Sequence, residues 1–304
     1  MNSYHIAAFY HFADLPDYRE WQGPLEALCA REHLIGTILL AHEGVNGTVS
    51  GPKRGLDMLL AFLRRDARLT SLKAKWSQTD DKPFLRMKVR LKKEIVSMGV
   101  AGIKPHERTG KQVPAAQWNA LIRDPDVLLI DTRNQYEIDV GTFAGAVSPH
   151  SDSFREFPDY VKDNLDPDKQ RKVAMFCTGG IRCEKASAYL LEQGFEDVYQ
   201  LEGGILQYLE DTEESDSLWR GECFVFDRRV TVDGALEPGS FVQCHACRRP
   251  LTQEETQNAH YEKGVSCLHC ITETSEERRA AFRERQRQVE LSKARGGQHI
   301  GPDA

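Results

Sequence analysis

The sequence predicts a multidomain chain of three modules: an α+β sandwich, a parallel α/β domain, and a small cysteine-rich module that ends in a helix. Residues 4–95 contain strand and helix patterns in the order βαββαβ, and residues 115–215 alternate short apolar strands with helices. The last part of the chain carries two Cys-x2-Cys pairs. A length of 304 residues is enough for about two domains and a smaller third unit.

Composition narrows the class of protein. Hydrophobic residues make up 40% of the chain, which suffices for globular cores, and the net charge of −6 gives no overall basic character. No run approaches the roughly 18 apolar residues of a membrane span, and the N-terminus lacks the pattern of a secretory signal. We therefore expect a cytoplasmic protein without a membrane partner. In that compartment, the eight cysteines should be reduced, metal-bound or catalytic.

The first module, over residues 1–98, is expected to be a ferredoxin-like α+β sandwich. Asn46-Gly47 is a turn signal between two of its strands. Apolar periodicity predicts helices at residues 17–31 and 56–64, with strands at residues 5–10, 35–41, 47–50, 72–77 and 86–91.

One strand of this module has a basic face. Charged and apolar residues alternate along it, so that one side carries Arg86, Lys88, Arg90 and Lys92. Such a face suits the phosphate backbone of a nucleic acid, and Trp76 is a candidate stacking residue. The alternative is an edge strand whose lysines prevent aggregation.

A linker rich in glycine and proline spans residues 99–114, and the second domain is expected over residues 115–218. One buried strand ends at Asp131, and another ends at Cys177. In a parallel α/β sheet, the ligand site lies at the carboxyl ends of the strands. Asp131 and Cys177 should therefore lie at the same edge of the sheet.

The segment after the Cys177 strand gives the strongest chemical prediction. Two glycines and an arginine follow the cysteine, and a helix-like run begins directly after them. The amides of such a loop can hold an anion, and the same field favours a thiolate over a thiol. Cys177 is therefore the expected nucleophile, in a loop that continues with Thr178, Gly179, Gly180, Ile181, Arg182 and Cys183.

The length of this loop indicates its ligand. Four residues separate Cys177 from Arg182, whereas cysteine-dependent phosphatases use a loop one residue longer, which makes a wider cradle. The shorter loop suits one additional sulfur atom on the cysteine, which is a persulfide. The alternative is a buried structural cysteine before a helix.

The residues around the loop have roles that the sequence leaves open. Arg182 either closes the cradle as a catalytic residue or pairs with a carboxylate such as Glu137. Asp131 and Arg133 are expected to orient the loop from the neighbouring strand. Cys183 is either a resolving partner for a persulfide or a packing residue.

The last module, over residues 219–304, is expected to resemble a zinc ribbon followed by a helix. Nineteen residues separate its two cysteine pairs, a spacing that fits a tetrahedral zinc site made of Cys244, Cys247, Cys267 and Cys270. The stretch between the pairs is polar, so a structural metal would explain how it folds. Free thiols, or a histidine in place of one sulfur, are the alternatives. Residues 275–295 predict an arginine-rich helix that is either solvated or in contact with nucleic acid.

The central segments resemble the rhodanese-like family. This resemblance is carried by Asp131-Thr132-Arg133, Tyr136-Glu137, Gly145-Ala146, the run from Cys177 to Arg182, and Leu201-Glu202-Gly203-Gly204. Residues 43–48 and 84–90, together with the C-terminal cysteine pairs, are similar to one branch of that family, the rhodanese-related tRNA uridine hydroxylases. The resemblance covers nearly all of residues 4–275.

The resemblance implies oxygen-dependent hydroxylation of uridine 34, in the anticodon loop of tRNA, to 5-hydroxyuridine, with Cys177 as the reactive cysteine. Molecular oxygen would be the co-substrate, and an unidentified electron donor would be a partner, because the sequence has no flavin or nicotinamide motif. A persulfide loop by itself predicts sulfur transfer, so a thiosulfate- or persulfide-dependent sulfurtransferase is the alternative. A non-catalytic RNA-binding module is the third possibility.

Overall fold

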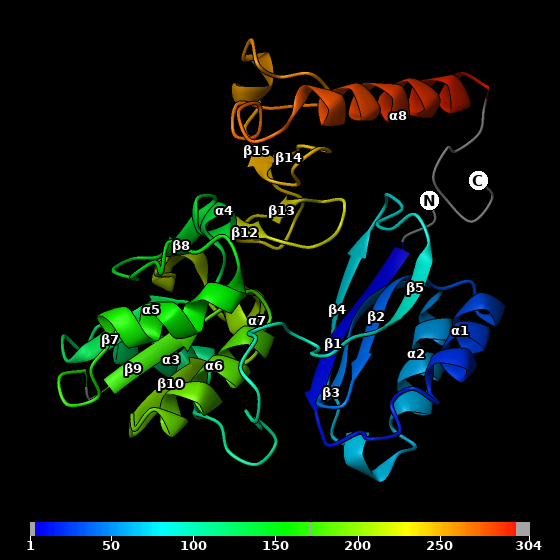
Figure 1. The fold of residues 1–304 in the computed structure, drawn as a ribbon. Coiled ribbons are helices and arrows are strands. Elements are labelled where there is room, and N and C mark those ends of the chain that lie inside the picture. Colours follow the sequence, from blue (N-terminus) through cyan, green and yellow to red (C-terminus); the bar gives the residue numbers. More distant parts are fainter. Residues whose placement is uncertain (1–3, 171, 296–304) are drawn as a thin grey trace.

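Three modules follow one another along the chain, as the sequence predicts (Figure 1). The computed structural model describes residues 4–170 and 172–295. In Figure 1, the N-terminal module (blue to cyan) lies beside the central domain (green), and the C-terminal module (yellow to red) lies above both. Within these described ranges, no helix combines the length and the hydrophobicity that crossing a membrane requires.

The N-terminal module is a five-stranded sheet with two helices on one face. The strand order is β4-β1-β3-β2-β5, in which β5 runs parallel to β2 and the other neighbours are antiparallel. The predicted βαββαβ order is present in β1 to β4, and β5 corresponds to the further strand predicted at residues 86–91. The elements are β1 (Tyr4–Phe12), α1 (Gln22–Arg31), β2 (Ile35–Ala41), β3 (Gly44–Gly51), α2 (Lys53–Leu63), β4 (Ala74–Thr79) and β5 (Met87–Leu91).

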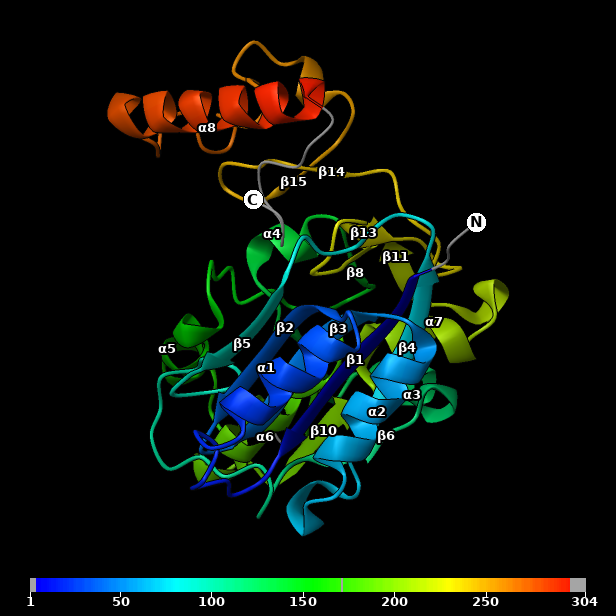
Figure 2. The same ribbon diagram turned by 90° about the vertical axis from the view of Figure 1, so that its right-hand side faces the viewer.

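The two faces of this sheet have different environments. Phe9, Ile38 and Leu40 are buried with the leucines of α1 and α2 in one apolar core. Their neighbours along the strands, such as Tyr10 and Leu39, point to the other face because side chains alternate along a strand. Figures 1 and 2 show the helices on the outer side and the central domain on the opposite side.

The predicted turn at Asn46-Gly47 is wrong. The chain turns at residues 42–43, and both Asn46 and Gly47 lie inside β3. Asn46 Nδ2 donates to the carbonyl oxygen of Ile95 at 3.0 Å. A Cβ atom on Gly47 would lie 2.6 Å from the ring of Phe9. Packing under an aromatic ring therefore explains this glycine.

The central domain is a parallel sheet with helices on both faces, which confirms the predicted α/β class. The strand order is β6-β10-β9-β7. One apolar core lies under α5 and α6, and another lies under α3 and α7. The elements are β6 (Lys111–Val113), α3 (Ala115–Ile122), β7 (Val127–Asp131), α4 (Gln135–Ile138), β8 (Gly141–Phe143), α5 (Phe157–Asn164), β9 (Lys172–Phe176), α6 (Ile181–Glu192), β10 (Asp197–Leu201) and α7 (Gly204–Asp211).

Two segments belong to the central domain although the expected boundaries exclude them. Strand β6 lies in the expected linker, but it pairs with β10 at the edge of the sheet. Strand β11 (Trp219–Gly221), beyond the expected boundary at residue 218, pairs with β8. Cys223 and Val225 lie in the same core as Phe176. Strands of three residues are too short to show an alternating pattern in the sequence.

The remaining chain forms the C-terminal module. Two short hairpins lead into it, and the long helix α8 ends it, as expected from the sequence. This helix begins after Ser275, whose side chain accepts a hydrogen bond from the amide of Arg278. The elements are β12 (Cys223–Phe224), β13 (Thr231–Val232), β14 (Val242–Gln243), β15 (Pro250–Leu251) and α8 (Glu276–Ala294).

A buried lysine joins the first two modules. The side chain of Lys185, on α6, is 1% exposed. Its Nζ donates to Glu43 Oε2 at 2.6 Å, to Glu94 Oε2 at 2.8 Å and to the carbonyl oxygen of Val96 at 3.1 Å. Glu43 lies in the turn between β2 and β3, and Glu94 follows β5. One ammonium group therefore fixes the N-terminal module to the helix that starts at the Cys177 loop.

Replacing Lys185 by methionine should destabilise the protein. The substitution leaves two carboxylates close together without their cation, so we expect the free energy of unfolding to fall by about 3 kcal/mol. Urea unfolding followed by fluorescence measures this change. Lys169→Met removes an exposed lysine that pairs with Asp166 on the surface, and it should change the value by less than about 0.5 kcal/mol. Equal effects of the two substitutions would contradict the proposed role of Lys185.

Candidate active site

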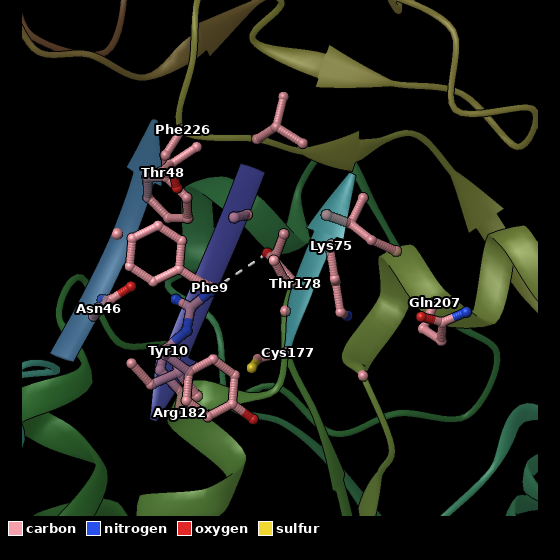
Figure 3. A pocket seen from close by; sticks show the side chains of 18 of the residues that line it. Phe9, Tyr10, Asn46, Thr48, Lys75, Cys177, Thr178, Arg182, Gln207 and Phe226 are labelled. Atoms are coloured by element: carbon pink, nitrogen blue, oxygen red, sulfur yellow. Dashed lines mark hydrogen bonds between the residues drawn. The ribbon is translucent and has the colours of Figure 1, made fainter. Parts of the chain in front are cut away.

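Cys177 directly follows β9 and lies at the floor of a pocket (Figure 3). Its side chain is 1% exposed. The amide of Gly180 donates to Cys177 Sγ at 3.1 Å. Gly180 has a φ of 103°, which residues with a Cβ rarely adopt, and α6 begins at the next residue. The helix N-terminus therefore adds a positive field at the sulfur.

The surroundings of Cys177 favour its thiolate. Burial alone would raise the pKa of this thiol, but a hydrogen bond from Cys183, the charge of Arg182 and the amide of Gly180 outweigh burial and hold the pKa well below its usual range. For Cys183 the balance is reversed, because burial and the Cys177 sulfur raise its pKa well above the usual range. Cys177 is therefore the anion, and Cys183 is the thiol that donates to it.

The start of α7 packs directly on the same loop. The amide of Ile205 donates to the carbonyl oxygen of Cys177 at 2.9 Å. A Cβ atom on Gly204 would lie 2.5 Å from that oxygen, and both Gly203 and Gly204 have positive φ angles, of 72° and 68°. The two glycines therefore let the N-termini of α6 and α7 meet at the cysteine.

Arg182 pairs with Glu137, which is one of the two roles that the sequence allows. Its Nη1 donates to Glu137 Oε2 at 2.6 Å, and its Nη2 donates to Glu137 Oε1 at 2.7 Å. The Glu137 side chain is fully buried. With both terminal nitrogens engaged in this way, Arg182 acts on Cys177 through its charge, as a positioning residue.

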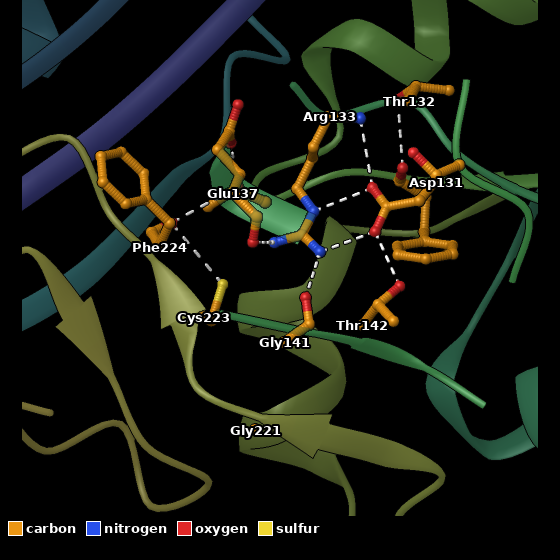
Figure 4. A network of polar contacts seen from close by, with 12 residues as sticks. Asp131, Thr132, Arg133, Glu137, Gly141, Thr142, Gly221, Cys223 and Phe224 are labelled. Atoms are coloured by element: carbon orange, nitrogen blue, oxygen red, sulfur yellow. Dashed lines mark hydrogen bonds and ion pairs between the residues drawn. The ribbon is translucent and has the colours of Figure 1, made fainter. Parts of the chain in front are cut away.

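A second buried ion pair, between Arg133 and Asp131, lies next to Glu137 (Figure 4). Arg133 Nε and Nη2 donate to the carboxylate of Asp131 at 2.9 and 2.6 Å. The same guanidinium donates to the carbonyl oxygens of Glu137 and Gly141. Thr142 Oγ1 donates to Asp131 Oδ2 at 2.9 Å. The structure thus brings together the three residues expected to support the loop, and the second pair holds the helix that carries Glu137.

The N-terminal module provides the opposite wall of the pocket, whose volume is about 1070 Å³. Tyr10, on β1, reaches the loop, because a Cβ atom on Gly180 would lie 2.8 Å from the Tyr10 hydroxyl. Tyr10 also hydrogen-bonds with Glu184, and burial raises the pKa of both groups. Phe226 lines the pocket as well and is 61% exposed. These residues have no sequence signal, since they come from segments far apart in the chain.

The basic strand predicted for RNA contact lies at the edge of the N-terminal sheet. Its residues are Arg86, Lys88, Arg90 and Lys92, of which Lys88 is half-buried and the others are exposed. Burial, the neighbouring arginines and Arg248 lower the pKa of Lys88. Burial and Arg248 also lower the pKa of Arg285. Positive charges of the C-terminal module thus lie close to this strand and to one another.

The four cysteines of the predicted metal site come together. Their sulfur atoms all lie within 4.8 Å of one another. Cys267 Sγ is 3.8 Å from Cys247 Sγ and 3.7 Å from Cys270 Sγ. A tetrahedral zinc ion with Zn–S bonds of about 2.3 Å requires sulfur separations of about 3.8 Å. The cluster could therefore hold zinc.

Comparisons with known proteins identify two domains in the chain. Residues 4–95 match the family model of the UPF0176 acylphosphatase-like domain, and residues 114–211 match that of the rhodanese-like domain. Similar solved structures include a rhodanese-like domain from Anabaena sp (19% identity, 36% of this chain and 78% of that chain, TM-score 0.31). A second example is a rhodanese-related protein from Thermoplasma volcanium (26% identity, 33% of this chain and 92% of that chain, TM-score 0.28). A third is a thiosulfate sulfurtransferase from Pseudomonas aeruginosa (19% identity, 38% of this chain and 21% of that chain, TM-score 0.31).

The lowered pKa of Cys177 predicts a thiolate at neutral pH. An ordinary thiol, with a pKa of about 8.5, is only about 3% ionised at pH 7. We expect the ultraviolet thiolate absorbance of the wild type, minus that of Cys177→Ala, to persist from alkaline pH to below pH 7 and then to disappear. Cys183→Ala should move this transition to higher pH, because it removes the thiol that donates to Cys177. A difference signal with its midpoint near pH 8.5 would show that the site does not activate this cysteine.

Proposed function

We propose that this protein converts uridine 34 of tRNA to 5-hydroxyuridine. The chain joins a UPF0176 acylphosphatase-like domain to a rhodanese-like domain, and this is the architecture of the tRNA uridine(34) hydroxylase family. The observation that carries this proposal is the position of Cys177, an activated cysteine at the floor of a pocket that the N-terminal module closes on the opposite side.

The size of the pocket supports a nucleotide substrate. Its volume of about 1070 Å³ lies at the upper end of the roughly 300–1,000 Å³ that is usual for small-molecule sites. That space exceeds what a thiosulfate ion needs, and it suits a nucleotide together with part of its neighbours. Uridine 34 belongs to a single-stranded loop, in which a base can turn away from the stack and enter a pocket.

The chemistry of Cys177 suits a reaction at C5 of uracil. In the mechanism we propose, its thiolate adds to C6, and the electrons of the C5–C6 double bond move toward C5 and the C4 oxygen. C5 then accepts an oxygen atom derived from molecular oxygen, the second atom of which leaves as water after an electron donor supplies two electrons and two protons are taken up. Loss of the proton from C5 and departure of the cysteine restore the ring.

Charge also supports an RNA partner. Arg248 of the C-terminal module lies close enough to Lys88, on β5, and to Arg285, on α8, to help lower the pKa of each. Like charges that are held close together destabilise the free protein, and the binding of a polyanion relieves their repulsion.

We propose zinc as the ion that orders the C-terminal module, since its buried apolar cluster, within the described residues, consists of Leu251 and three of the cysteines.

A persulfide-dependent sulfurtransferase is the second candidate, and the cysteine loop is the observation that favours it. The amide of Gly180 and two helix N-termini would stabilise a persulfide on Cys177 as well as a thiolate. A non-catalytic RNA-binding module is less consistent with the chain, because the cysteine and its activating contacts are all present.

Nucleoside mass spectrometry of tRNA tests the proposed function. Cells without the gene should lose 5-hydroxyuridine and accumulate uridine at position 34, and the wild-type gene should restore the modification. Cys177→Ala should not restore it, because the nucleophile is absent. Cys29→Ala removes another buried thiol, in the core of the N-terminal module, and should restore it. Loss of a thiolated nucleoside with normal 5-hydroxyuridine would favour the sulfurtransferase.

Removal of zinc should unfold the C-terminal module alone. Each purified chain should contain about one zinc ion, and a strong chelator or the double substitution Cys244→Ser and Cys247→Ser should abolish it. Protease digestion should then cut within residues 242–295, while the other two modules resist. A chain that lacks zinc and still protects this region would contradict the structural role of the metal.

A further inference from the structure

Lys75 is one of the residues that line the pocket. It belongs to β4, and Figure 3 shows its side chain pointing into the pocket beside Cys177. Its Nζ is buried and has no hydrogen-bond partner within residues 4–170 and 172–295. Burial lowers the pKa of Lys75 to about 8, although the nearby Cys177 opposes the shift. The group is therefore mostly protonated at neutral pH, and burying its charge without a hydrogen bond is unfavourable in the free protein.

Other cations of the pocket are already neutralised. Arg182 pairs with Glu137, and Arg229 pairs with Asp227, each at 2.6 Å. Lys75 differs from both, because no carboxylate in the described part of the chain accepts a hydrogen bond from its Nζ. Its Nζ also lies close to the start of α7, 3.1 Å from the position of a Cβ atom on residue 203. An ammonium group beside a helix N-terminus is an arrangement that attracts an anion.

The strand register places Lys75 at one end of a row that crosses the sheet. Lys75 is opposite Ala8, Ala8 is opposite Thr48, Thr48 is opposite Thr37, and Thr37 is opposite Lys88. Residues in register on neighbouring strands share a face. A lysine therefore stands at each edge, separated by four strand spacings of about 4.8 Å, or roughly 19 Å. The three residues between them have short side chains, are half-buried and line the pocket.

The adjacent row of residues on the same face runs from Tyr10, on β1, to a basic residue on the edge strand β5. Tyr10 is opposite Asn46, Asn46 is opposite Leu39, and Leu39 is opposite Arg90. The ring of Tyr10 lies next to the Cys177 loop, where it offers a stacking surface for a base. Positive charge thus occurs at both edges of one open face, and an aromatic ring lies between them.

We infer that this face of the N-terminal sheet binds a single-stranded RNA segment, and that Lys75 holds a phosphate of the nucleotide that reaches Cys177. The inference rests on the proposed function, because it takes RNA as the substrate. A small sulfur anion would need Lys75 alone, whereas charges roughly 19 Å apart on one face match a chain of several phosphates. The short side chains of Ala8, Thr48 and Thr37 leave room for the RNA backbone and bases to lie along the sheet.

Fluorescence anisotropy with an end-labelled anticodon stem-loop RNA tests this inference. Lys75→Met should bind the RNA about tenfold more weakly, and the slope of log affinity against log salt should become shallower by about 0.7. Lys75→Arg should restore most of the affinity, because it keeps the charge. The thermal midpoint of Lys75→Met should be equal to or above that of the wild type, because a buried unpaired charge has been removed.

Two controls separate this site from general electrostatics. Lys169→Met removes an exposed charge just before β9 begins, which is the edge of the sheet opposite to Cys177, and it should change RNA affinity less than twofold. A hairpin with the same stem and a closed tetraloop should bind weakly and be insensitive to Lys75→Met. Unchanged affinity of Lys75→Met for the anticodon stem-loop, or an equal loss for the tetraloop hairpin, would overturn the inference.

Further outcomes distinguish the inference from the proposed function. If Lys75→Met loses thiosulfate binding and keeps RNA binding, Lys75 serves a small anion and the inference is wrong. RNA binding that depends on Lys75, in a protein that does not form 5-hydroxyuridine, would support the inference and remove the proposed function. If the protein hydroxylates tRNA but binds it independently of Lys75, the proposed function is supported and the inference about Lys75 is wrong.

Discussion

The contact between Lys185 and two glutamates is the interaction on which the candidate site depends. The cysteine loop lies at one end of a parallel sheet, and this edge becomes a pocket because the N-terminal sheet stands opposite to it. Lys185 fixes that position from the helix that begins at the loop, and its partners are the turn residue Glu43 and, just after β5, Glu94. This explains why residues 43–48 look distinctive in the sequence although they contain no catalytic group: Glu43 contacts the central domain, and Asn46 and Thr48 line the pocket.

Charges around the pocket fall into two groups with different consequences. The pairs Arg133–Asp131 and Arg182–Glu137 are buried, each is joined by two hydrogen bonds, and each is close to neutral. They therefore set the shape of the loop and should change little when a ligand binds. Contacts from Cys183, Arg182 and the Gly180 amide stabilise the buried Cys177 thiolate, whereas no hydrogen bond reaches Lys75 Nζ within the described residues. The buried lysine weakens the free protein, and groups with shifted pKa values such as these two are concentrated where a protein binds or reacts.

The sequence predicts what is encoded locally and misses what depends on distant contacts. The parallel sheet, the Cys177 loop and the four-cysteine cluster follow from short patterns, and the structure contains each of them. Tyr10, Lys75 and Lys185 carry no pattern of their own, because their roles arise when segments more than a hundred residues apart meet. The turn at Asn46-Gly47 fails for a related reason. Its dipeptide favours a turn, but the packing of Phe9 against Gly47 and the contact from Asn46 to residue 95 place both residues in a strand.

A loop that evolved to stabilise charge on sulfur does not by itself decide between sulfur transfer and addition to a base. Both reactions begin with the same thiolate, and both benefit from the Gly180 amide and the helix N-termini around it. What differs is the partner that can approach. An open sheet edge admits small acceptors, whereas a second wall, with Tyr10 over the loop and an unpaired lysine beside it, favours a larger anionic ligand with a flat face. We therefore propose that the N-terminal module selects the ligand that reaches Cys177.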